Sequence, residues 1–232
     1  MLVSHLYRFI YTKTSKTAST SVEVFFEPYC MREGEWDFSH GRDEYESEAG
    51  IIGERGKDQT GKKWYNHMPA SAIKEKLGTE IWDSYFKFCT IRNPFDKLIS
   101  GFHFDFPQFK ENNADKTLMK KAFRERIING KFLDDRNRYI IGDKMCVDSV
   151  IRYEYLQEDM KRICNRLGIS YEPARLPRLK AQFRPSGVEY QAYYDLDTIA
   201  TVANYYKFEI LNFQFSIPDL SAARYAESVL NT

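Results

Sequence analysis

A hydroxyl-rich segment near the start of the sequence has the residue types that bind phosphate. Residues 15–21 read SKTASTS, after an apolar run at 6–11 and before another at 22–26, which indicates a strand, a turn and a helix. A helix N-terminus presents unpaired N–H groups and partial positive charge, so anions bind there. Lys16 adds a full charge and the hydroxyls add donors. The alternative is a Ser/Thr helix cap beside a solvated lysine.

A second segment, RNPFDKLIS at residues 92–100, places an arginine directly after a buried-strand pattern at 85–91. Arginine is a poor core residue there and would seek an anion. Asn93-Pro94 turns the chain and a helical pattern follows, so Ser100 can come back toward Arg92 from the second helical turn. An arginine with a serine hydroxyl suits a phosphate monoester. A surface arginine with a helix-interior serine is the alternative.

The first segment is not the loop that holds ATP or GTP. That loop reads G-x-x-x-x-G-K-[ST], and no glycine occurs between residues 1 and 32. No clear strand ends in an acidic residue that would hold magnesium. The four cysteines are widely spaced without a C-x-x-C pair, which favours reduced thiols over a disulfide framework or zinc site. The sequence therefore predicts a phosphate cradle without a metal.

The two segments together resemble the phosphoadenosine phosphosulfate (PAPS)-dependent sulfotransferases, especially the carbohydrate-type branch. That family has a P-K-T-G-[ST]-[ST]-[ST]-like loop, which residues 15–21 match with Ser15 for the proline and Ala18 for the glycine. Its second motif, R-N-P-[YF]-[DE]-[RK]-x-x-S, matches residues 92–100. Softer similarity lies at 65–70, 151–156 and 190–195, so the resemblance spans most of the chain from residue 6 to about residue 215.

The resemblance implies roles for the matching residues. Lys16 would stabilise the leaving phosphate. Backbone N–H groups and hydroxyls of the loop would cradle the 5′-phosphate of PAPS, a set that comprises Lys16, Thr17, Ala18, Ser19, Thr20 and Ser21. Arg92 and Ser100 would bind the 3′-phosphate. PAPS would be the donor and PAP, adenosine 3′,5′-bisphosphate, the product, with no metal.

Transfer to a hydroxyl or amine also needs a base. His67 is our first candidate, because its ordinary pKa of about 6.5 suits proton abstraction near neutral pH and it stands just before a helix start. A structural histidine is the alternative. Glu33, Glu35 and His40 are reserves, since some members of the family use a carboxylate from that region.

A basic loop late in the chain is a candidate lid over the nucleotide. Residues 173–190 carry three prolines and a basic cluster, of which Lys180 and Arg184 are expected to reach the phosphates. A solvated loop, or a surface for an anionic acceptor, is the other interpretation.

The elements that position these residues indicate an α/β fold. Strand patterns at 6–11, 85–91 and 150–153 alternate with helical patterns, which favours a mainly parallel sheet. The resemblance implies that this sheet is central and P-loop-like, flanked by helices in a sulfotransferase-type three-layer arrangement. Helices are expected at 69–77, 95–102, 118–128, 156–167 and 195–208. We expect a single domain over 1–232, with a long polar excursion at 31–66 and a peripheral tail at 218–232.

Composition limits the partners. The chain has 232 residues, with 34 Lys plus Arg against 33 Asp plus Glu, so the net charge is +1. This balance argues against a protein whose main work is coating nucleic acid or anionic membrane. No signal peptide or run of 18 apolar residues occurs, so a bacterial-type cytoplasmic enzyme without integral membrane association is expected.

The acceptor is open between a glycan, a lipid and a small metabolite, and so is the oligomeric state. Two other functions compete with sulfuryl transfer: an atypical P-loop nucleotide or small-molecule kinase, and a non-catalytic nucleotide-binding module.

Overall fold

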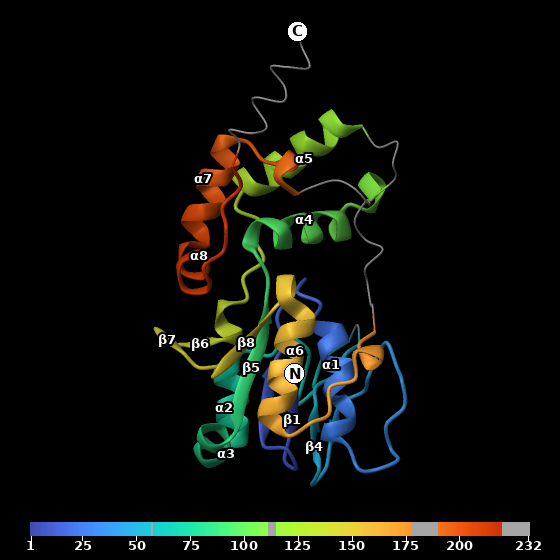
Figure 1. The fold of residues 1–232 in the computed structure, drawn as a ribbon. Helices are drawn as coiled ribbons and strands as arrows, with labels where there is room; N and C mark the ends of the chain where they lie inside the picture. Colours follow the sequence, from blue (N-terminus) through green and yellow to red (C-terminus); the bar gives the residue numbers. More distant parts are fainter. Residues whose placement is uncertain (57, 111–114, 178–189, 220–232) are drawn as a thin grey trace. The chain divides into compact units, whose positions relative to one another are not determined.

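The computed structural model describes residues 1–56, 58–110, 115–177 and 190–219 (Figure 1). The chain divides into two compact units. Unit 1 comprises Met1–Ile91 with Asp134–Leu179, and unit 2 comprises Arg92–Leu133 with Lys180–Thr232. The expected single domain over 1–232 remains a prediction.

Unit 1 is built on a six-stranded sheet in the order β3-β4-β1-β2-β5-β8. Its strands are β1 (Leu2–Ser4), β2 (Phe9–Thr12), β3 (Tyr45–Glu46), β4 (Gly50–Ile52), β5 (Phe86–Ile91) and β8 (Ser149–Arg152). β2, β5 and β8 pair in parallel, whereas β1 pairs antiparallel with both β2 and β4. β4 therefore runs in the same direction as β2, and four of the six strands share one direction. A separate hairpin joins β6 (Ile140–Ile141) and β7 (Lys144–Met145).

Helices cover both faces of this sheet. The helices of unit 1 are α1 (Ser19–Phe26), α2 (Ala70–Leu77), α3 (Thr79–Ser84) and α6 (Leu156–Leu167). Because side chains alternate along a strand, Phe9 packs with α1 and α6, and Ile10 packs with α2 and α3. Each fully buried phenylalanine stabilises such a layer by about 1.5–3 kcal/mol. The expected three-layer α/β architecture is confirmed.

Unit 2 is helical. Its elements are α4 (Pro94–Asp105), α5 (Lys116–Ile128), α7 (Leu196–Tyr205) and α8 (Lys207–Phe213). Phe95, Leu98, Ile99 and Phe102 of α4 share one buried face, as their spacing predicts, and pack in a cluster that includes Phe123 of α5. The expected helix at 195–208 is two helices, because Tyr206 lies between α7 and α8 and caps both.

The segment at 31–66 departs from the expected polar excursion. It supplies β3 and β4, and Ile51, Ile52 and Trp64 are buried. Its polar composition conceals these strands, since β4 is only three residues long and its apolar residues have no period to detect. The tail expected at 218–232 lies outside the described residues from 220 on.

Candidate phosphate site

The loop between β2 and α1 has a strained backbone. It runs over residues 13–18 and adopts left-handed conformations at Lys16, with φ of 61°, and at Ala18, with φ of 59°. Residues with a Cβ lose about 1–2 kcal/mol in this region, which glycine occupies freely. The loop therefore has two residues in the left-handed conformation that glycine usually adopts, although neither of them is glycine.

Three threonine hydroxyls hold this loop to the neighbouring strand. Thr17 Oγ1 lies 2.9 Å from Thr90 Oγ1 on β5 and 2.8 Å from Thr14 Oγ1. Thr14 Oγ1 donates to the carbonyl oxygen of Thr90 over 2.5 Å. We call Thr14, Thr17 and Thr90 the threonine clasp. All three side chains are buried, so the clasp fixes both ends of the strained turn from inside.

The first backbone N–H groups of α1 are not capped by side-chain hydroxyls. Ser19 Oγ donates to the carbonyl oxygen of Thr14 over 2.6 Å, and α1 begins after Ala18 without a side-chain cap. The hydroxyls of Thr17 and Ser19, expected as phosphate donors, thus point into the loop. Thr20 is half-buried, and its hydroxyl has no partner among the residues that the structure describes. Ser21 is buried.

A carboxylate from a distant part of unit 1 also binds the loop. The backbone N–H of Ser15 donates to Asp135 Oδ2 over 2.8 Å. Asp135 is only 3% exposed. Sequence reasoning missed this residue, because no local pattern connects position 135 to position 15.

Lys13 and Lys16 have different environments. Lys13 is 1% exposed, and its Nζ lies 2.5 Å from Glu23 Oε2 on α1. Arg55 Nη1 lies 2.9 Å from the same oxygen. Burial raises the pKa of Glu23, but these cations outweigh it and hold the pKa well below its usual range. Lys13 is therefore part of a buried ion-pair network, whereas Lys16 is half-buried in the loop itself.

The structure brings His67 to the base of the loop. His67 Nδ1 lies 3.2 Å from the carbonyl oxygen of Lys13. A carbonyl only accepts, so Nδ1 carries the hydrogen and Nε2 keeps its lone pair. Burial, reinforced by the nearby Lys13 charge, lowers the pKa of His67 to about 4. The ring is therefore neutral at pH 7, with an accepting nitrogen.

The reserve bases have no such link to the loop in the described parts of the chain. Glu33 and His40 are exposed. Glu35 is also exposed, and its Oε2 accepts from the Tyr45 hydroxyl over 2.7 Å. Of the four candidate bases, His67 is the one whose described contacts reach the loop.

Unit 2 carries the second motif at the start of α4. Arg92 is 8% exposed, and its Nη2 lies 2.6 Å from Asp96 Oδ2. The anion expected beside Arg92 is thus, in this structure, a carboxylate of the same motif. Ser100 lies one turn beyond Asp96 on α4 and is half-buried, and its hydroxyl has no partner within the described residues.

The N-terminus of α4 is closed by its own residues. The Asn93 side chain accepts from the backbone N–H of Phe95 over 3.0 Å, and Pro94 occupies the first helical position. Asn93 Nδ2 also donates to the carbonyl oxygen of Ser216 over 2.8 Å. A ligand at this motif would therefore meet side chains rather than free backbone amides.

Two predicted phosphate ligands lie outside the described residues. Lys180 and Arg184 fall within 178–189, so their expected role as a lid stays a prediction. Of the same basic cluster, Arg175 is described: its guanidinium lies 5.1 Å from the Phe25 ring centre and donates to the Tyr29 hydroxyl over 2.7 Å.

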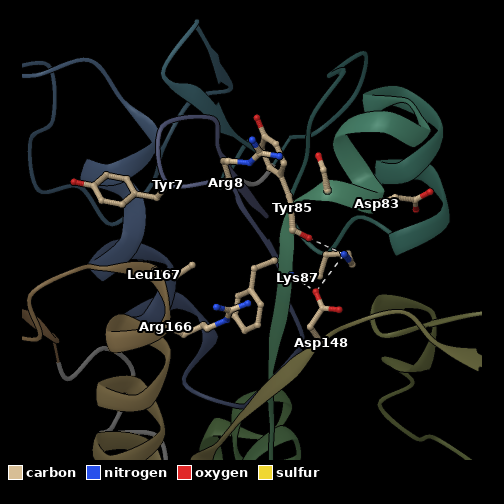
Figure 2. Close-up of a pocket in the computed structure, with 10 residues that line it drawn as sticks. Tyr7, Arg8, Asp83, Tyr85, Lys87, Asp148, Arg166 and Leu167 are labelled. Carbon is tan, nitrogen blue, oxygen red and sulfur yellow. Dashed lines mark hydrogen bonds and ion pairs between the residues drawn. The ribbon is translucent and has the colours of Figure 1, made fainter.

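A hollow of about 460 Å³ lies at the other end of the same strands (Figure 2). Arg8 and Lys87 line it at the amino ends of β2 and β5. Lys87 Nζ donates to the carbonyl oxygen of Tyr85 over 2.6 Å and lies 3.2 Å from Asp148 Oδ2. The loop at 13–18, which we call the phosphate loop, follows the carboxyl end of β2, so this hollow is separate from it.

The fold and the loop define an α/β protein with a strand–loop–helix arrangement of the phosphate-binding kind. A family model described as "Sulfotransferase family" matches residues 1–140. The chain belongs to the sulfotransferase family. A protein of Archaeoglobus fulgidus described as "Uncharacterized protein" is 29% identical over 110 residues, which are 45% of this chain and 86% of that protein.

The described residues contain no group of three or more His, Cys, Asp or Glu side chains that could hold a metal ion. Within the same residues, no helix has the length and apolarity to cross a membrane. None of the four cysteines, all of which lie within the described residues, forms a disulfide.

Proposed function

We propose that this protein transfers a sulfuryl group from PAPS to a hydroxyl or amine of an acceptor. Family membership gives sulfuryl transfer as the general activity. The single observation that carries the finer proposal is the strained, uncapped loop between β2 and α1, with Lys16 at its apex. Its first-turn amides and the helix dipole suit the 5′-phosphate of the donor.

The reaction breaks the bond between sulfur and the bridging phosphate oxygen and forms a bond from sulfur to the acceptor. Negative charge develops on the leaving phosphate, and preorganised donors stabilise such charge. Lys16 supplies a full positive charge from the loop that holds this phosphate. PAP leaves carrying the electrons of the broken bond.

The acceptor proton needs a lone pair within the site. His67 Nε2 has one, because Nδ1 donates to the Lys13 carbonyl. A pKa of about 4 makes the neutral ring a weak base that stays unprotonated over the whole physiological range. His67 is therefore our proposed base, ahead of Glu33, Glu35 and His40.

Arg92 and Ser100 are the proposed ligands of the 3′-phosphate. The guanidinium is positioned by Asp96, whose Oδ2 accepts from Arg92 Nε over 2.8 Å. Guanidinium groups bind phosphate with two parallel hydrogen bonds. We propose that Arg92 and Ser100 together select a nucleotide that carries a 3′-phosphate. Lys180 and Arg184 are proposed as further ligands of the same nucleotide.

The acceptor class is proposed on the family branch alone: a carbohydrate or small metabolite in the cytoplasm, with a lipid as the further option. The test is transfer of labelled sulfonate from PAPS to a panel of glycans, lipids and small alcohols, with Lys16→Ala as the matched inactive control. Transfer to at least one acceptor class by the parent, and not by the variant, is expected.

Two results would replace this proposal. Magnesium-dependent transfer of phosphate from ATP, without preference for 3′-phosphorylated nucleotides, would establish an atypical kinase. Tight PAP binding with no transfer to any acceptor would establish a nucleotide-binding module.

A further inference from the structure

We propose that Asp135 is a positioning residue of the phosphate loop, which fixes the backbone at Ser15 so that the amides after it are ordered before a phosphate arrives. The identity of the ligand rests on the proposed function, whereas the contact between Ser15 and Asp135 does not depend on it. Ser15 N donates to Asp135 Oδ2 over 2.8 Å and across 120 positions of sequence.

The location of Asp135 is unusual for a site that binds an anion. A buried carboxylate beside a phosphate loop repels the ligand, so attraction does not explain its presence. Its charge-assisted hydrogen bond to a backbone amide is, by contrast, one of the stronger contacts that a loop can have. The carboxylate therefore acts on its protein surroundings rather than by attracting the ligand: it holds the loop through the Ser15 N–H, and its charge favours the protonated form of His67.

The loop needs such a contact because its backbone is strained. Ser15 immediately precedes Lys16, which has a φ of 61°, and Ala18 has a φ of 59°. Residues in such conformations persist only where their surroundings determine them fully. The threonine clasp holds Thr14 and Thr17 through their side chains, and Asp135 holds the backbone between them.

The contact depends on the residue at position 15. Proline, which the loop pattern of the resembling family has at this position, carries no N–H and is unable to donate to Asp135. The bond is therefore lost when Asp135 is replaced by a side chain without an acceptor or when Ser15 is replaced by proline, whereas any other residue at position 15 keeps the N–H.

Two substitutions of Asp135 separate positioning from electrostatics. Asp135→Asn removes the charge and keeps an oxygen that accepts from Ser15, so PAP should bind within about threefold of the parent, or more tightly. Asp135→Ala removes both the charge and the accepting oxygen, so PAP should bind about tenfold more weakly. This factor corresponds to the free-energy cost of ordering roughly one backbone residue on binding. A carboxylate with no positioning role predicts tighter binding for both variants.

Substitution of Ser15 tests the same bond from the donor side. Ser15→Pro should weaken PAP binding about tenfold and add less than about twofold to the loss in an Asp135→Ala background. Ser15→Ala keeps the N–H and is the matched control. The melting temperature of each variant and amide hydrogen exchange at Ser15 distinguish a misfolded chain from a loosened loop.

The outcomes are distinct. Weaker PAP binding by Asp135→Ala, recovered in Asp135→Asn and coupled to Ser15→Pro, supports the positioning role. Equal or tighter binding by Asp135→Ala overturns it, as do independent, additive losses in the double variant. A parent that binds no PAP overturns the proposed function instead, and faster exchange of the Ser15 amide in Asp135→Ala would still establish the contact.

Discussion

The two motifs of this chain both follow a parallel strand and both begin a helix, yet they present different chemistry. The first leaves the N-terminus of α1 uncapped after a left-handed Ala18 and turns its hydroxyls inward. The second caps α4 with Asn93 and Pro94 and places Arg92 beside Asp96. The difference supports our proposal that the first motif binds phosphate through backbone amides and a single lysine, and the second through side chains.

This contrast has a physical reason. Free amides at a helix N-terminus surround a phosphate closely but do not distinguish one phosphate from another. A guanidinium and a hydroxyl, held at fixed positions, recognise one group by its geometry. We therefore expect the loop of unit 1 to govern the reaction rate and the motif of unit 2 to govern the choice of nucleotide.

The largest expected effect is on the rate. Lys16→Ala should lower the rate of sulfuryl transfer about 10²- to 10³-fold, because one preorganised donor to the developing charge is lost. Initial rates with saturating PAPS measure it. Lys63→Ala is the control, since Lys63 is exposed and pairs with Glu46. A Lys16→Ala rate within about threefold of the parent would remove the loop from the chemistry.

A smaller effect is expected on nucleotide choice. Arg92→Ala should weaken PAP binding roughly 10- to 100-fold and leave 5′-AMP binding nearly unchanged, because the hydrogen bonds that we propose for Arg92 go to the 3′-phosphate. Calorimetry with both nucleotides measures this difference. The exposed Arg124, which pairs with Asp195 and Asp197, provides the control variant Arg124→Ala. Equal losses for the two nucleotides would contradict the assignment of Arg92.

The pH dependence of stability tests the buried histidine. The pKa of His67 is about 4 in the folded protein, against an ordinary 6.5. Between these values the unfolded chain binds the proton and the folded chain does not, so the free energy of unfolding falls as the pH drops from about 6.5 to 4. Full stability from this group is present above pH 6.5.

His67→Asn should flatten that decline. Asparagine tolerates the left-handed φ of 55° at this position and keeps an N–H for the Lys13 carbonyl, but does not titrate. Urea unfolding of both proteins at pH 7 and pH 5 gives the comparison. Identical pH slopes would show that the imidazole does not contribute.

The two helix starts should differ in how much a substitution changes the free energy of unfolding. Asn93→Ala should lower the free energy of unfolding by about 1 kcal/mol, because α4 loses its cap. Chemical denaturation measures this change. An unchanged midpoint would mean that the cap of α4 contributes little.

Ala18→Gly should have the smallest effect, within about 0.5 kcal/mol of the parent. Glycine relieves the left-handed strain at this position and gives a similar amount of freedom to the unfolded chain. The same denaturation series measures it, and PAP binding should be preserved. A loss above about 1 kcal/mol would indicate that the Cβ of Ala18 has a packing role.

Local patterns predicted much of this structure. The helix at 156–167 has the bounds that its apolar spacing gives, and Gly168 ends it with a φ of 69°. The strand expected at 85–91 is β5, shorter by one residue. Such elements repeat a period along the chain, so the sequence alone reveals them.

What sequence reasoning missed depends on contacts between distant residues. β1 and β4 have three residues each, too few for a period. They are defined by their pairing, β1 with β2 and β4, and β4 with β1 and β3. The sequence shows that Thr17 and Ser19 carry hydroxyls. It does not show that these hydroxyls point into the loop, because their direction is set by hydrogen bonds to Thr90 Oγ1 and to the carbonyl oxygen of Thr14. Asp135 contacts Ser15 across 120 positions of sequence, and no local pattern predicts that contact.

Calorimetric titration of the parent with PAP in the absence of magnesium tests the central claim most directly. We expect saturable binding at micromolar ligand, weaker binding of 5′-AMP, and weaker binding of PAP to Lys16→Ala and to Arg92→Ala than to the parent. No binding of PAP to the parent at high micromolar ligand would contradict it.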